Sequence, residues 1–225
     1  MAFSSHELPE LPGLAGLKTH NIYCIGRNYA AHARELNNPV PDRPVMFTKP
    51  LASLTFDGVI RIPSFVKEPH FETELVAVIG KSGRNIEQDR ALEHVAGYGI
   101  GIDVTARDIQ QELKASAHPW FLAKGLDTFA PVSDFLPAGE LPDPEKLTFT
   151  LTVNGERRQT GDPSLMLFPL PDLIARLSRF VTLHPGDLLF TGTPEGVGLL
   201  SDDDRLHAEL LSGRIVLDVR VEISN

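Results

Sequence analysis

The sequence predicts a mixed, β-rich α+β fold in which the few helices are short. Short runs of β-branched and aromatic residues recur along all 225 residues, whereas helical periodicity is confined to four places. The 18 prolines and 18 glycines are spread through the chain, and no repeat, low-complexity tract or linker divides it. With 42% hydrophobic residues the chain can bury a sizeable core. We therefore expect one main domain over residues 18–225, preceded by a short Pro-rich segment over residues 1–17.

The order of the elements follows from local patterns. The expected strands are 21–26, 44–50, 59–63, 74–80, 97–104, 147–154, 187–194 and 213–221, and the expected helices are 28–36, 89–95, 105–115 and 171–180. Asn154-Gly155 between two strand-like runs predicts a tight hairpin. Asn28 is expected to cap the first helix, and Thr105 with Asp108 at the third position is expected to cap another.

Charge and composition exclude several classes of protein. The formal net charge of -9 repels phosphate groups, and no basic run accompanies the aromatic residues, so nucleic acid and anionic membranes are not expected partners. The apolar runs are far shorter than the roughly 20 residues that span a bilayer. The N-terminus has neither a basic start nor a sustained apolar core, so we expect a cytoplasmic protein. Cys24, the only cysteine, is expected to be a buried apolar residue.

An acidic pair opens the run HFETELVAVIG. Glu72 and Glu74 project from the same face of a strand, so their carboxylates can share one cation. A hard ion such as Mg²⁺ or Mn²⁺ would offset the cost of two like charges beside a buried run. The spacing alone also fits a solvated strand end whose charges pair with Lys or Arg.

A third carboxylate, Asp103, ends a Gly-rich strand directly before a predicted helix. It is either another ligand of the same ion or a helix cap. Gly97, Gly99 and Gly101 alternate along the strand without the G-x-G-x-x-G spacing of a nucleotide loop, which favours close backbone packing.

His32 and Glu35 lie three residues apart in GRNYAAHARE, on one face of a short helix. A carboxylate in that position can orient an imidazole and raise its basicity, which is the arrangement of a general base that deprotonates water. An exposed ion pair is the alternative.

Cations beside turn-forming residues could hold an anionic substrate or stabilise an oxyanion, or could simply be surface charges. They are Arg27, Lys49, Arg107 and Lys124. The segment 187–198, with Thr191 and Thr193, is a Gly-rich turn that either closes over a small anion or only leaves a strand. It is not a phosphate loop, because the Gly-Lys-Ser/Thr ending is missing.

Seven motifs in order resemble the fumarylacetoacetate hydrolase superfamily. They are GRNYAAHARE, FTKP, HFETELVAVIGK, GYGIGIDVTARDIQ, PWFLAKGLDTFAPV, VNGERRQTG and PGDLLFTGTPEGVG, and the match runs from about residue 22 to 221. The closest resemblance is to the short single-domain branch of acylpyruvases, oxaloacetate decarboxylases and 2-hydroxyhepta-2,4-diene-1,7-dioate isomerases. One departure is LLSDDDRLHAELLSGRIV, near Asp203, where relatives commonly have a Gly-Asp turn; it includes none of the expected metal ligands.

The resemblance implies a β-clip-like sheet roll with short flanking helices, usually a homodimer, with residues 18–225 as the catalytic domain. It implies Mg²⁺ or Mn²⁺ held by Glu72, Glu74 and Asp103, with Lys124 beside the metal. It also implies a catalytic dyad of His32 and Glu35. The expected substrate-binding residues are Arg27, Lys49, Arg107, Gln110 and Thr193.

The implied reaction is hydrolysis of the carbon-carbon bond of an acylpyruvate-type 2,4-dioxo acid through a metal-bound enolate, with His32 activating water. The alternative is decarboxylation of oxaloacetate, or decarboxylation and isomerisation of unsaturated 2-oxo diacids in aromatic catabolism. A non-catalytic protein that binds 2-oxo acids is an alternative of another class.

Overall fold

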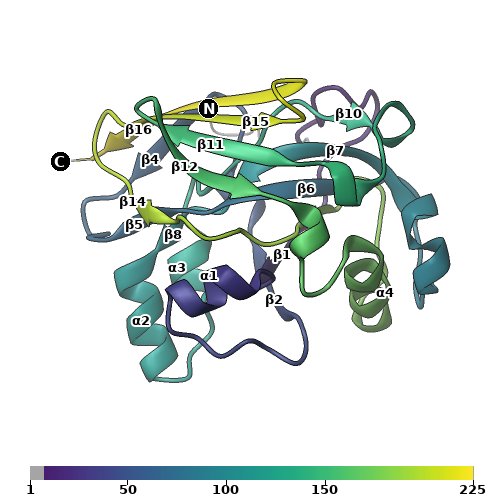
Figure 1. The fold of residues 1–225 in the computed structure, drawn as a ribbon, viewed down its shortest axis with the longest axis horizontal. Coiled ribbons are helices and arrows are strands. Elements are labelled where there is room, and N and C mark those ends of the chain that lie inside the picture. The colour runs from purple at the N-terminus through teal and green to yellow at the C-terminus, as the bar shows by residue number, and fades with distance from the viewer. Residues whose placement is uncertain (1–7, 225) are drawn as a thin grey trace.

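Two stacked β-sheets form the body of the protein (Figure 1). The computed structural model describes residues 8–224. Six strands make the first sheet, in the order β10 (Leu136–Pro137), β7 (Val95–Ile102), β6 (Thr73–Ile79), β13 (Leu188–Phe190), β1 (Ile22–Gly26) and β2 (Val45–Lys49). All neighbours in it are antiparallel except β1 and β13. Every residue of β6 is buried, because both faces of this central strand are covered.

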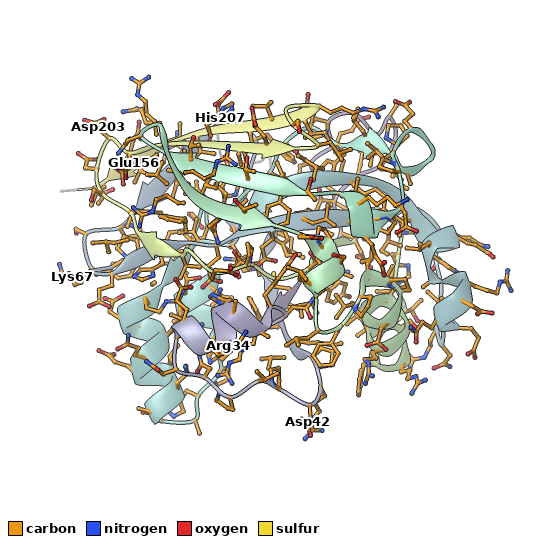
Figure 2. The ribbon with its side chains drawn as sticks, in the orientation of Figure 1. Arg34, Asp42, Lys67, Glu156, Asp203 and His207 are labelled. Carbon is orange, nitrogen blue, oxygen red and sulfur yellow. The ribbon has the colours of Figure 1, made fainter. Side chains whose placement is uncertain are left out.

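The second sheet lies over the first and has five strands. Their order is β12 (Glu156–Gly161), β11 (Phe149–Val153), β15 (Arg205–Leu210), β16 (Ile215–Ile223) and β4 (Val59–Ile62). Burial alternates along β16, with Leu217, Val219 and Val221 turned inward. These side chains join Leu75 and Ile100 of the first sheet in the main hydrophobic cluster, so the core lies between the two sheets. Charged side chains such as Lys67, Asp203 and His207 project from the outer surface (Figure 2).

Short strands and helices complete the fold. The small sheets are β14 (Gly198–Leu199), β5 (Pro69–Phe71) and β8 (Thr105–Ala106), and β3 (Leu54–Thr55) with β9 (Ala130–Pro131). The α-helices are α1 (Ala30–Glu35), α2 (Arg107–Ala115), α3 (Phe121–Lys124) and α4 (Leu170–Phe180). The 3₁₀ helices are η1 (Leu51–Ser53), η2 (Gln88–His94), η3 (Ala138–Glu140), η4 (Pro144–Lys146) and η5 (Pro163–Leu165). Helices α1, α2 and α3 gather beneath one end of the sheets (Figure 1).

The predicted β-rich α+β class is confirmed, and so are several local predictions. Asn154 and Gly155 have positive φ angles of 53° and 84° and join β11 to β12. Close packing along β7 is also confirmed, because a Cβ added to Gly101 would lie 2.7 Å from the Phe190 ring. Cys24 is buried, as expected. Near Asp203 (φ 64°) the chain does turn tightly.

Both predicted side-chain caps are wrong. Thr105 belongs to β8, where it pairs with His70 of β5, so α2 begins only at Arg107 with Ala106 before it. The Asn28 amide instead donates to the backbone oxygens of Phe168 and Thr191 at 3.1 and 2.7 Å. Asn28 thus ties the start of α1 to the loop after β13, and no side chain caps that helix.

The predicted N-terminal segment packs on the first sheet over its described part. Leu11 and Leu14 are buried in a second cluster with Val76, Phe135 and Phe190. Residues 1–7 lie outside the described part of the chain. Among residues 8–224, none of the helices combines the length and the hydropathy needed to cross a membrane.

Candidate metal-binding active site

The register of β5, β6 and β7 brings the three predicted carboxylates together. Glu72 lies between β5 and β6, Glu74 is in β6, and Asp103 directly follows β7. Thr73 pairs with Ile102, and the Asp103 amide donates to the Glu72 carbonyl at 2.7 Å, so the ends of the two strands are fixed together. One oxygen from each carboxylate lies within 4.8 Å of the others, and all three residues are buried.

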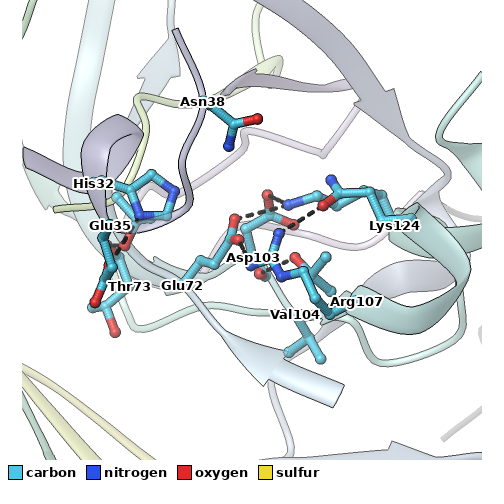
Figure 3. Close-up of polar contacts among 12 residues, drawn as sticks. His32, Glu35, Asn38, Glu72, Thr73, Asp103, Val104, Arg107 and Lys124 are labelled. Carbon is cyan, nitrogen blue, oxygen red and sulfur yellow. Dashed lines mark hydrogen bonds and ion pairs between the residues drawn. The ribbon is translucent and has the colours of Figure 1, made fainter. Parts of the chain in front are cut away.

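Three buried cations surround two of these carboxylates, and Figure 3 shows two of them, Lys124 and Arg107, beside Glu72 and Asp103. The Lys124 ammonium lies 2.8 Å from Glu72 Oε2 and 2.5 Å from Asp103 Oδ2. Arg107 Nη2 contacts Glu72 Oε1, and Arg107 Nη1 donates to Gln110 Oε1 at 2.6 Å. Burial opposes ionisation of Glu72, but the charges of Lys124 and Arg107 outweigh it and hold the pKa of Glu72 well below its usual range.

Lys49 supports Asp103 from the side away from the pocket. Its ammonium lies 2.8 Å from Asp103 Oδ1, donates to the Val104 carbonyl at 3.0 Å and also donates to the Lys124 carbonyl. The Lys49 ammonium thus makes one ion pair and two hydrogen bonds, all to protein atoms. A direct contact between Lys49 and substrate, predicted from the sequence, stays a prediction.

Glu74 lacks such a cation among the residues that the structure describes. Its one hydrogen-bond partner there is the Gly192 amide, 2.7 Å from Glu74 Oε2. Burial and then the negative charge of Asp103 raise the pKa of Glu74 well above its usual range. A divalent cation in contact with all three carboxylates would remove this penalty, and oxygen ligands are those that Mg²⁺ and Mn²⁺ prefer. The residues present therefore fit the expected metal.

His32 and Glu35 lie beside this centre on α1. His32 is only 4% exposed, and its Nδ1 is 3.5 Å from Glu35 Oε2. Burial is the main cause of a lowered pKa for His32; Arg107 lowers it further, whereas Glu72 and Glu35 raise it. The imidazole is therefore neutral at pH 7 and can accept a proton.

The loop after β13 connects the two parts of the site. At Gly192 (φ 100°), a Cβ would lie 2.6 Å from Asn28 Cβ, so glycine is required where the amide reaches Glu74. The Gly196 amide donates to both oxygens of Glu35, at 3.1 and 3.2 Å. This turn therefore uses its amides to hold two protein carboxylates.

Gln159 of β12 is a functional candidate that the sequence reasoning missed. Its Oε1 accepts from the amide of Thr73, the residue between the two glutamates, at 3.0 Å. Its Nε2 donates to Thr193 Oγ1 at 2.8 Å and to the Pro194 carbonyl at 3.0 Å. The Thr193 hydroxyl in turn donates to the Thr73 carbonyl at 2.8 Å. Gln159 thus joins the metal-binding strand to the turn that holds Glu35.

A small pocket of about 30 Å³ opens onto Glu72, one of the three carboxylates. Of the predicted site residues, Arg27, His32, Glu72, Arg107, Gln110 and Lys124 line it. The other predicted site residues do not line it, namely Glu35, Lys49, Glu74, Asp103 and Thr193. The predicted contact of Thr193 with substrate also stays a prediction. Asn38 and Lys114 line the pocket as well and were not singled out from the sequence. The sequence signals closest to these residues are the VNGERRQTG motif, which contains Gln159, and the TARDIQ motif, which ends four residues before Lys114.

Comparison with known proteins is consistent with this geometry. The model of the family "Fumarylacetoacetate (FAA) hydrolase C-terminal" matches residues 21–222. The oxaloacetate tautomerase FAHD1, mitochondrial, of Arabidopsis thaliana is 48% identical over 79% of this chain and 80% of its own length. Bos taurus FAHD1 is 41% identical over 90% and 91%. A structure of fumarylpyruvate hydrolase from Pseudomonas aeruginosa with Mn²⁺ and pyruvate is similar, with a TM-score of 0.83, 35% identity and coverage of 98% and 100%.

Proposed function

Because the chain belongs to the fumarylacetoacetate hydrolase family, we propose that it is a Mg²⁺- or Mn²⁺-dependent enzyme that hydrolyses the carbon-carbon bond of acylpyruvates. The observation that carries the proposal is a buried His32 that lines the same pocket as Glu72, which belongs to a buried set of three carboxylates. The carboxylates supply a place for the metal, and His32 supplies a base for water. Hydrolysis of a 2,4-dioxo acid requires both functions close together, and His32 lines the same pocket as Glu72, one of the three carboxylates.

The metal would be held by Glu72, Glu74 and Asp103. When bound, it would act as a Lewis acid toward the 2-oxo acid. The P. aeruginosa relative, whose structure contains Mn²⁺ and pyruvate, supports this choice of metal and ligand class. Arg107 and Gln110 border the same end of the pocket, where they can contact the substrate carboxylate. Lys124, with its ammonium between Glu72 and Asp103, can stabilise negative charge that develops on oxygen.

His32 is the proposed general base. Its Nδ1 faces Glu35, so the proton would sit on Nδ1 and the lone pair on Nε2, which is then free to accept a proton from water. Glu35 is itself fixed by the Gly196 amide. The dyad would therefore deprotonate water for attack on the distal carbonyl, and His32 would return the proton to the product.

A second function, on oxaloacetate, is favoured by the relatives named oxaloacetate tautomerase, which are 41% and 48% identical to this chain. Decarboxylation or tautomerisation of oxaloacetate needs no attacking water, so the metal-binding end of the pocket could serve it. His32 would then only move protons.

The test is a substrate panel with one Mg²⁺-loaded preparation and a His32→Gln variant. We expect the wild type to cleave acylpyruvates and His32→Gln to lose about 100-fold or more in kcat, the usual contribution of a general base. Oxaloacetate turnover should fall less in that variant. Loss of both activities to the same extent would contradict the division of roles. Binding of 2-oxo acids without any turnover would favour the non-catalytic alternative.

We also propose that the protein is a cytoplasmic homodimer and that residues 18–225 form its catalytic domain. Strand β2 is an edge of the first sheet, and beside it Met46 and Phe180 line an open groove of about 500 Å³. Phe180 is 75% exposed, as expected for a surface that a second copy could cover. Light scattering coupled to size-exclusion chromatography would measure the mass, and Phe180→Ser should lower it if this face forms the dimer.

A further inference from the structure

The lining of the candidate active-site pocket includes two cations that the proposed reaction does not use. Arg27 and Lys114 line the pocket together with Arg107 and Lys124. The latter two pair with Glu72, whereas within residues 8–224 neither Arg27 nor Lys114 has a carboxylate partner. Lys114 Nζ instead donates to Asn38 Oδ1 at 3.0 Å. Two such cations beside one cavity form a site for an anion.

Helix α2 determines how far this second site lies from the carboxylates. Gln110 lies three residues after Arg107, and Lys114 lies seven residues after it. All three side chains therefore share one face of the helix. With a rise of 1.5 Å per residue, the Cα atoms of Arg107 and Lys114 are separated by roughly 10 Å along the axis. Arg107 contacts Glu72 beside the other carboxylates, whereas Lys114 contacts Asn38, which Figure 3 shows above them.

Arg27 and Lys114 repel each other, and no carboxylate pairs with either of them within residues 8–224. Partial burial, then Arg27, then Arg107 lower the pKa of the Lys114 ammonium. Arg27 is also held in the left-handed region, at φ 59°, which is unusual for a residue other than glycine and costs conformational energy. An anion between Arg27 and Lys114 would relieve the repulsion, and a carboxylate suits both the guanidinium fork and the ammonium group.

We propose that Arg27 and Lys114 bind a second carboxylate of the substrate, so that the enzyme selects 2-oxo diacids over 2-oxo monoacids. This inference rests on the proposed function, because it takes the metal end of the pocket to hold the 2-oxo acid group. The carbon chain between the two carboxylates would run past Leu36, Phe47 and Trp120, the apolar residues of the pocket. Asn38 positions Lys114 through its side-chain oxygen.

Binding of an inert matched pair tests the second site without requiring catalysis. The pair is 2-oxopentanedioate and 2-oxopentanoate, which have the same chain length and differ only in the distal carboxylate. Their Kd values are measured by calorimetry with Mn²⁺-loaded protein at fixed ionic strength. We expect the diacid to bind the wild type about 10- to 100-fold more tightly, the effect of one or two hydrogen bonds to a charged group. Lys114→Met should remove most of that difference and leave the Kd of the monoacid within about twofold.

Two further variants test whether the preference for the diacid depends on this site. Arg27→Gln should reduce the same preference, and Lys146→Met, on the exposed 3₁₀ helix η4, should not change it. Equal affinities of the wild type for both ligands, or equal losses for both in Lys114→Met, would overturn the second carboxylate site. If the wild type prefers the diacid but cleaves no acylpyruvate, the proposed hydrolysis fails while the second site stands.

Discussion

Closely spaced pairs of charged residues occur in two regions of the molecule, one buried and one exposed. The pairs differ in how much they contribute to stability. The buried charge cluster consists of Glu72, Glu74, Asp103, Lys49, Arg107 and Lys124, with side chains almost inaccessible to water. The surface charge cluster consists of His207, Glu209, Asp218, Arg220 and Asp203 on and beside β15 and β16 (Figure 2). His207 Nδ1 lies 2.7 Å from Asp218 Oδ1, as close as the buried pairs, but these side chains are 43% and 75% exposed.

The difference shows that burial, rather than distance, decides what an ion pair contributes. Exposed pairs gain little because water and salt already screen both charges. Buried charges cannot exchange partners with water, so removal of one leaves the others uncompensated. The buried cluster is therefore stable only as a complete set, and this requirement makes it suitable for binding a metal ion.

The largest expected effect comes from Asp103→Ala. This change leaves Lys49 facing no carboxylate and removes one of the two carboxylates that contact Lys124, so we expect a loss of about 3–5 kcal/mol in the free energy of unfolding. The matched surface change, Asp218→Ala, should cost well under about 1 kcal/mol. Urea unfolding followed by circular dichroism measures both. Similar costs for the two variants would break the comparison.

The next effect is stabilisation by metal. Mn²⁺ at about 100 times its Kd should stabilise the wild type by about 2.7 kcal/mol, seen as a rise in Tm by differential scanning calorimetry. Glu74→Gln keeps the shape of the side chain but removes a ligand charge, so it should abolish most of the metal-induced rise. Because Glu74 has no cationic partner among the described residues, the metal-free variant should be as stable as the metal-free wild type or more so. A full metal-induced rise in Glu74→Gln would argue against Glu74 as a ligand.

A smaller loss is expected for Gln159→Ala. The Thr73 amide would lose its acceptor in a buried position, at a cost of about 1–3 kcal/mol. A positioning role also predicts weaker Mn²⁺ binding and a lower kcat, since the variant loosens both the glutamate strand and the turn that holds Glu35. Calorimetric titration with Mn²⁺ measures the predicted loss of Mn²⁺ affinity separately from the loss of stability. Gln111→Ala, on the exposed face of α2, serves as the control.

The smallest effect concerns pH and the surface cluster. The hydrogen bonds to Asp218 and Glu209 raise the pKa of His207. The contribution of His207 is therefore complete below about pH 6.5, the ordinary pKa of histidine, and is lost as pH rises through the higher pKa of the folded state. Since the residue is exposed, we expect less than about 1 kcal/mol. The unfolding free energies of wild type and His207→Gln should differ more at about pH 5.5 than at about pH 8.5. A larger difference in unfolding free energy at the higher pH would contradict the raised pKa of His207.

The sequence predicted the three carboxylates well because the relevant signals are local. Glu74 lies in β6, Glu72 directly precedes that strand and Asp103 directly follows its neighbour β7, so the paired strand ends bring the three carboxylates together. Gln159 could not be found in this way, because it bonds to Thr73 across 86 residues and between two sheets. Asn28 and Thr105 were misassigned since tertiary partners and strand pairing took precedence over local capping preference.

The pairing of β1 with β13 has a consequence for folding. Ile22 lies beside Leu188, and the loop that follows β13 carries the amide that reaches Glu74. Closing so long a segment of chain is entropically costly and slows folding. During synthesis β1 can pair early with β2, but its parallel neighbour β13 exists only once residues 188–190 have been made, so we expect full metal affinity to arise only after this late pairing.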